Sequence, residues 1–129
     1  MLTLSPMTVA PVCHVGDPLQ LTCIASVEFL RWNVLRVNEQ GDLVDVINSE
    51  IINSRDIVQT KHTPLNSATL TFMRISAQGA SPLVSMLSID SVSIHLNGTV
   101  VRCSDIANPM TSASTTIQII DISRSKLPI

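Results

Sequence analysis

The side chains of this 129-residue chain that could carry chemistry are three cysteines, three histidines and ten acidic residues. A cysteine can form a disulfide, or it can act as a nucleophile if a base lies beside it. His14 follows Cys13 directly, but adjacent residues of a strand point to opposite faces, so these two do not form a nucleophile–base pair. Thiol chemistry is therefore expected as disulfide formation or as a free buried thiol, with these residues as candidates: Cys13, Cys23 and Cys103.

The histidines and carboxylates show no catalytic or metal-binding pattern. The histidines are far apart and lack a Cys-x-x-Cys partner, which argues against a zinc site: His14, His62 and His95. The acidic residues are dispersed, and several fall in predicted turns, where hydrogen bonding to the backbone accounts for them: Asp17, Asp42 and Asp90. No nucleophile-elbow, zincin or P-loop motif occurs. We expect neither an enzyme nor a cofactor or metal ion.

The amino-acid composition excludes several classes of protein. Hydrophobic residues make up 45% of the chain and charged residues 14%, the opposite of a disordered segment. The net charge of -2, with scattered Lys and Arg, argues against a nucleic-acid partner. No apolar run approaches the roughly 20 residues that span a bilayer, so we expect membrane attachment only through a segment outside this sequence.

Alternating apolar and polar residues predict strands, and no stretch has a convincing helical period. Turn signals rich in Gly, Pro, Asn and Asp separate them, so we expect an all-β sandwich of about nine strands. We assign residues 1–11 to a lead-in or edge strand, 12–122 to one domain and 123–129 to a linker. The main predicted strands are 12–15, 19–25, 30–38, 43–47, 68–75, 83–89, 99–105 and 115–122, with short candidates at 51–52 and 57–58.

Four segments resemble the immunoglobulin superfamily: residues 16–23 (GDPLQLTC), 30–32 (LRW), 87–92 (LSIDSV) and 97–103 (NGTVVRC). The resemblance implies an immunoglobulin-like two-sheet Greek-key sandwich, V-set-like or I-set-like. It implies a disulfide between Cys23 and Cys103 that joins the two sheets, with Trp32 packed on it as the core pin. The sequence resembles those of ectodomains of metazoan, particularly invertebrate, cell-surface receptors and adhesion proteins.

The chain departs from the family at informative positions. Val101 stands where a tyrosine usually closes a corner of the fold, and Asn97 stands where an aspartate is usual. The last strand lacks the Phe-Gly-x-Gly bulge through which antibody variable domains pair, so pairing of that kind is not expected.

Two residues have open readings. Cys13 is the odd cysteine: it is either a free thiol on an edge strand, or it pairs with another chain or with flanking sequence. Asn97 opens Asn97-Gly98-Thr99, which is the one N-glycosylation sequon and also a tight-turn dipeptide.

The expected function is extracellular recognition or adhesion at the cell surface, by a glycoprotein ectodomain that binds a protein partner, with homophilic binding included. Two surfaces are candidates. One is a set of loops at one end of the sandwich: residues 25–29, 48–53 and 104–114. The other is the outward face of the Trp32 sheet, formed by Arg31, Asn33, Leu35, Val37, Val44 and Val46. The alternative for the sheet face is that these side chains pack under residues 48–67. The alternatives for the function are a structural spacer in a multi-domain protein and an intracellular structural domain with reduced thiols.

Overall fold

The computed structural model describes residues 2–5, 12–53, 55, 60–65, 68–77, 79, 81–108 and 110–120. This part of the chain is all-β, with one short 3₁₀ helix, η1 (Ile94–Leu96). The strands are β1 (Leu2–Ser5), β2 (Val12–His14), β3 (Leu19–Ala25), β4 (Phe29–Val37), β5 (Leu43–Asn53), β6 (Thr60–Leu65), β7 (Ala68–Arg74), β8 (Leu83–Ile89), β9 (Val100–Asp105), β10 (Ser112–Thr116) and β11 (Gln118–Ile120).

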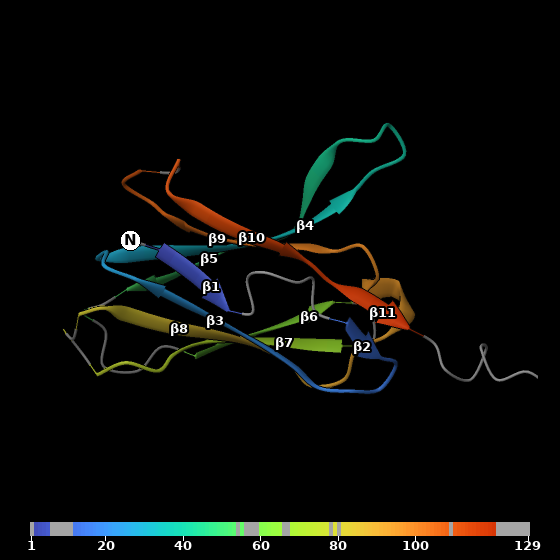
Figure 1. Cartoon of the computed structure of the whole chain (residues 1–129), viewed down its shortest axis with the longest axis horizontal. Coiled ribbons are helices and arrows are strands. Elements are labelled where there is room, and N and C mark those ends of the chain that lie inside the picture. Colours follow the sequence, from blue (N-terminus) through green and yellow to red (C-terminus); the bar gives the residue numbers. More distant parts are fainter. Residues whose placement is uncertain are drawn as a thin grey trace, which may run out of the picture.

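The strands form two large antiparallel sheets and one small parallel pair. One sheet has the order β1-β3-β8-β7-β6 and the other the order β10-β9-β4-β5, while β11 pairs with β2 in parallel. The two large sheets lie one on the other, and the β2–β11 pair lies toward one end (Figure 1). The prediction of an all-β domain is confirmed, and about nine strands result when β1 with β2 and β10 with β11 are each counted as one interrupted strand.

Predicted and observed strands agree best where alternation is cleanest. The strands predicted at 19–25 and 83–89 are β3 and β8 with the same bounds. The strand predicted at 43–47 extends to Asn53 and takes in the candidate at 51–52. Residues 2–5 of the predicted lead-in pair with β3, whereas 6–11, the candidate at 57–58 and the predicted linker at 123–129 lie outside the described residues.

The core lies between the large sheets, on the faces that alternation predicts. Every second residue of β3 and β8 is buried, starting at Leu19 and Leu83. The largest buried side chains are Trp32 from β4 and Phe72 from β7, whose ring centroids lie 6.3 Å apart across the sandwich. A contiguous apolar core of this kind is the main source of stability of the fold.

The β4–β5 pair is irregular. Trp32 is paired with Glu50 and Val34 with Ile47, so β5 holds one extra residue between these pairs. Leu35 is paired with Asp45, which leaves a second extra residue in β5. Such bulges rotate the strand that contains them and increase its twist. Figure 1 shows that the turn of this hairpin stands clear of the sandwich.

The strand predicted at 115–122 is divided because its two halves join different partners. β10 pairs with β9 up to Thr116, and β11 then pairs with β2. Ile117, at the division, is fully buried, and its N–H donates to the carbonyl of Thr99. The change of partner attaches β2 to the end of the sandwich that holds η1.

Candidate functional site

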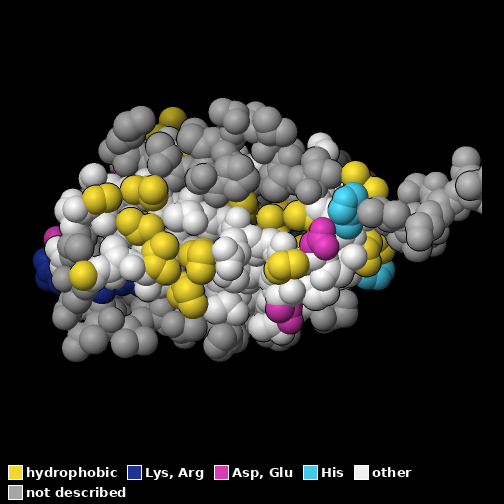
Figure 2. All heavy atoms as spheres, turned by 60° about the horizontal axis from the view of Figure 1, so that its bottom comes forward, with side chains coloured by type: hydrophobic (Ala, Val, Ile, Leu, Met, Phe, Trp, Pro, Cys, Tyr) yellow, Lys and Arg dark blue, Asp and Glu magenta, His cyan; other side chains and the backbone are white. Residues whose placement is uncertain are grey.

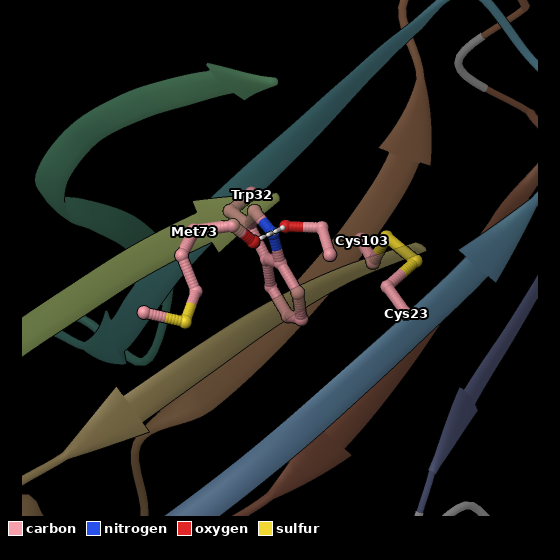
Figure 3. The surroundings of a disulfide bond; sticks show 5 residues. Cys23, Trp32, Met73 and Cys103 are labelled. Atoms are coloured by element: carbon pink, nitrogen blue, oxygen red, sulfur yellow. Dashed lines mark hydrogen bonds between the residues drawn. A yellow bond between two sulfur atoms is a disulfide. The ribbon is translucent and has the colours of Figure 1, made fainter. Parts of the chain in front are cut away.

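The two large sheets are joined by a disulfide between Cys23 of β3 and Cys103 of β9. The Cα atoms of the two residues lie 6.5 Å apart, and both side chains are fully buried. Trp32 is the cross-strand neighbour of Cys103 on β4 and is 1% exposed. The disulfide expected from the resemblance is thus confirmed, and the indole lies deep in the core close beside it (Figure 3).

Ser85, which was not among the residues expected from the sequence, makes a second connection between the sheets. The indole Nε1–H of Trp32 donates to Ser85 Oγ at 2.9 Å, and the hydroxyl of Ser85 donates to the carbonyl of Met73 at 2.8 Å (Figure 3). Ser85 is fully buried on β8. The available signal is a serine at a core position of an alternating strand, between Leu83 and Leu87, since a buried hydroxyl needs a partner.

Cys13 is a free thiol buried on β2, opposite Ile119 of β11. Burial, and next the negative charge of Asp17, raise the pKa of the Cys13 thiol. A raised pKa lowers the thiolate fraction, so the sulfur is a poor nucleophile in this fold. Its pairing with another chain or with flanking sequence stays a prediction.

Asn97 follows η1, at the end of the sandwich that holds β11. Its side chain is exposed, and its Oδ1 accepts the backbone N–H of Ile119 at 2.9 Å. This bond uses the amide oxygen, whereas a glycan attaches to Nδ2, so the described geometry leaves the attachment atom available. Thr99, the third residue of the sequon, is 1% exposed and its hydroxyl has no described partner. Glycosylation of Asn97 stays a prediction.

The six residues expected on the outward face of the Trp32 sheet do not form one patch. Arg31 and Asn33 alternate with buried residues on the outer side of β4 and are half-buried. Leu35, on the same side, is only 6% exposed, whereas Val37 is 60% exposed in the projecting hairpin. Partner binding by this face stays a prediction.

The register beside the hairpin turn explains where the remaining two residues lie. Val44 is paired with Arg36 in the part of the ladder between the turn and the first extra residue, so it lies on the face of Arg36 and not on that of Leu35 and Val37. Val46 packs against the hydrophobic core. The expected grouping of these two valines with the outward residues of β4 placed β5 one residue out of this register.

Two of the loops expected to form a binding end do meet. The N–H of Ile106 donates to the carbonyl of Phe29 at 3.3 Å, which holds the loop after β9 against the start of β4. Glu28 forms an exposed ion pair of 3.0 Å with Arg55. The third expected loop, 48–53, is instead the last part of β5. These loops lie at the left end of Figure 1, opposite η1.

A shallow depression of about 310 Å³ opens between these loops, lined by Ser26, Val27, Glu28, Phe29, Asp105 and Ala107. Phe29 is 40% exposed. Asp105 accepts the N–H of Ala107 through one oxygen, and Glu28 engages Arg55 through one oxygen. Each carboxylate therefore keeps a second oxygen for an incoming donor. Two carboxylates beside a half-exposed aromatic ring suit a cationic group. We call these six lining residues the loop-end depression.

Within the described ranges, no group of three or more His, Cys, Asp or Glu side chains could hold a metal ion. The same part of the chain contains no helix that is long and apolar enough to cross a membrane. No protein-family model matches the sequence, and no curated protein matches it either.

Proposed function

We propose that this chain is an extracellular recognition domain of immunoglobulin-like, variable-type fold that binds a protein partner through the loop-end depression. The strand orders β1-β3-β8-β7 and β10-β9-β4-β5 support the fold, since they parallel the order A-B-E-D and G-F-C-C′ of such domains. The parallel β2–β11 pair, an edge strand divided between the sheets, also supports it. One departure is β6, which pairs with β7 and not with β5.

The cysteines support an extracellular location for the domain. A buried disulfide that closes a loop of 80 residues is typical of proteins that fold in an oxidising environment. The exposed amide of Asn97, at the end opposite the depression, is a compatible glycan site in that compartment. A glycan there would leave the loop-end depression uncovered.

The loop-end depression carries the functional part of the proposal. Its chemistry favours a Lys or Arg side chain of the partner, whose ammonium or guanidinium group would pair with Glu28 and Asp105 while its alkyl stem packs on Phe29. The depression is shallow, so a single contact of this kind contributes little affinity, and binding depends on neighbouring loop residues or on multivalency.

The test uses small probes that carry only the proposed chemistry. N-acetyl-arginine amide and N-acetyl-lysine amide are titrated into the isotope-labelled domain, with N-acetyl-glutamate amide as the control of opposite charge. We expect saturable amide shifts confined to residues 26–29 and 105–107 for the basic probes alone. Glu28→Gln combined with Asp105→Asn should abolish these shifts, while Asp42→Asn, in the distant hairpin turn, should leave them unchanged.

Shifts spread evenly over the surface, or equal shifts with the acidic probe, would refute recognition at this end and favour a structural spacer. The compartment is tested separately on protein taken from its natural cells. An intact mass two protons below that of the reduced chain supports the extracellular assignment. Three free thiols would overturn that assignment without bearing on the probe titration.

A further inference from the structure

We infer that the outer face of the five-stranded sheet is a self-association surface that takes a second copy of this chain. This face is distinct from the loop-end depression, and the inference does not rest on the function proposed for that depression.

The face is built from three cross-strand rows on β3, β8 and β7. Residues paired across these strands share a face of the sheet, so the backbone register defines each row. In the first row, the N–H of Ile75, just beyond β7, donates to the carbonyl of Val84. The rows are Ile24–Val84–Ile75, Thr22–Met86–Met73 and Gln20–Ser88–Thr71. These nine residues are here called the β3–β8–β7 face.

The β3–β8–β7 face is apolar toward the loop end and polar toward the other. Ile24 is 38% exposed and Ile75 is 47% exposed, and the two residues flank half-buried Val84. Figure 2 shows hydrophobic side chains gathered on the left and in the centre of this view, with Lys and Arg side chains at its left edge and acidic side chains to the right of the centre. A contiguous patch of this type on a described surface indicates an interaction site.

The absence of charge from these nine residues points to a second copy as the occupant. In a two-fold symmetric contact, a residue near the axis meets the same residue of the partner, so any charge there is repelled by its own copy. The β3–β8–β7 face has no such charge, whereas Arg31 and Arg102 occupy the outer side of the other sheet. Met73 and Met86 are flexible enough to adapt to each other across the axis.

The size of the face limits the strength of the contact. At ordinary strand spacing and rise, three strands of this length present roughly 300 Å² per copy. Stable complexes bury about 1,200–2,000 Å² in total, so this contact is a weak one. Self-association then becomes significant where many copies are held close together, for which multivalent display is sufficient.

The experiment measures self-association of the oxidised domain by sedimentation velocity over a wide range of concentration. We expect the weight-average sedimentation coefficient to rise with concentration. Met86→Glu and Met86→Lys should each remove that rise, because the new charge meets its own copy. An equimolar mixture of the two variants should restore it. Ser114→Glu places the same charge on an exposed outer position of the four-stranded sheet and should have no effect.

Ile24→Lys is a second variant in case the Met86 variants fold poorly. Ile24 is more exposed than Met86, so its substitution should abolish the rise in sedimentation coefficient without loss of structure. A sedimentation coefficient independent of concentration would overturn the inference. So would a rise that Ser114→Glu removes and Met86→Glu does not. The loop-end variant Glu28→Gln with Asp105→Asn should self-associate normally, so failure of either proposal can be recognised without the other.

Discussion

The β3–β8 pair and the β4–β5 pair make an instructive contrast within one sandwich. β3 and β8 are paired over seven consecutive residues with no shift of register. β4 and β5 are paired over a similar length, yet two extra residues in β5 divide the ladder into three parts. The regular pair has an uncharged outer face, whereas the bulged pair ends in a hairpin that projects from the body (Figure 1).

The regular and the bulged strand pairs give the molecule different surface features. An unbroken period of two keeps every second side chain of β3 and β8 on one continuous outer face, which a two-fold symmetric contact can use. Bulges give up that continuity, but they increase twist and carry the hairpin away from the sandwich. The same two sheets therefore offer a broad surface on one side and an extended projection on the other.

The largest predicted effect comes from removing the covalent link between the two sheets, which joins β3 to β9. Cys23→Ala with Cys103→Ala should lower the free energy of unfolding by about 4–5 kcal/mol, because a loop of this length is no longer closed in the unfolded chain. Urea titration followed by far-ultraviolet circular dichroism measures the loss. Cys13→Ala is the control and should cost about 1 kcal/mol, since it removes only a small buried side chain. Equal losses in the two variants would contradict the role of the disulfide.

Ser85→Ala tests the polar connection between the regular strand β8 and the indole of β4. We expect a loss of about 1–3 kcal/mol in the free energy of unfolding, because the buried Nε1–H of Trp32 would be left without an acceptor. Ser88→Ala, on the outer side of the same strand, should change the free energy of unfolding by less than about 0.5 kcal/mol. If the two substitutions have the same effect, the hydrogen bond contributes nothing to stability.

Gly41→Ala tests the turn of the bulged pair. Gly41 has a φ of 88°, a left-handed conformation that a Cβ disfavours, although no atom would contact that Cβ within 4 Å. We expect a loss of about 1 kcal/mol, which arises from backbone conformation alone. Gln40→Ala, at the preceding position of the turn, should be close to neutral in the same urea titration. A neutral Gly41→Ala would mean that the projecting hairpin can form another turn.

Asp90→Asn gives the smallest effect and concerns the end of the regular sheet. The backbone N–H of Thr69, and next that of Ser91, donate to Asp90 and lower the pKa of its carboxyl group. Because this pKa is lower in the folded chain than in the unfolded chain, ionised Asp90 stabilises the fold above the unfolded value of about 3.9. That contribution disappears as the pH falls through the folded pKa.

The substitution should therefore flatten the dependence of the urea midpoint on pH below about pH 4. It should lower the midpoint slightly at pH 7, where the contribution of the ionised carboxylate is lost, and should change it least at acid pH, where Asp90 is protonated in both states. Asp42→Asn in the hairpin turn is the matched control. An acid limb unchanged by Asp90→Asn, or changed equally by Asp42→Asn, would contradict the assignment.

The contrast between the two pairs also marks how far the sequence alone leads. The bounds of β3 and β8, the burial of Trp32 and the cysteine pair that joins the sheets were predictable, because alternation indicates the strands and the resemblance noted in the sequence implied the pairing. The extra residues of β5 were not, since a bulge leaves no local mark in a run of Val, Ile and polar residues. The register across the β4–β5 turn was not predictable either, so Val44 and Val46 were grouped with the wrong side chains of β4.

The candidate surfaces were predictable only in part. The meeting of Phe29 with Ile106 followed from the general arrangement of loops at one end of a sandwich. The link from Trp32 to Ser85 spans 53 positions, and the rows of the β3–β8–β7 face need the register of three strands. Unlike the cysteine pair, these contacts have no motif that marks them, so they become visible only once the pairing of the strands is known.

The seclusion of Trp32 has an optical consequence. The chain contains one tryptophan and no tyrosine, so its intrinsic fluorescence and most of its near-ultraviolet absorption come from this one indole. The indole lies close to a disulfide, which is an efficient quencher, and away from water. Reduction of the disulfide should therefore brighten the emission, and unfolding should shift it to the red. The domain carries its own probe for the part of the core that holds its sheets together.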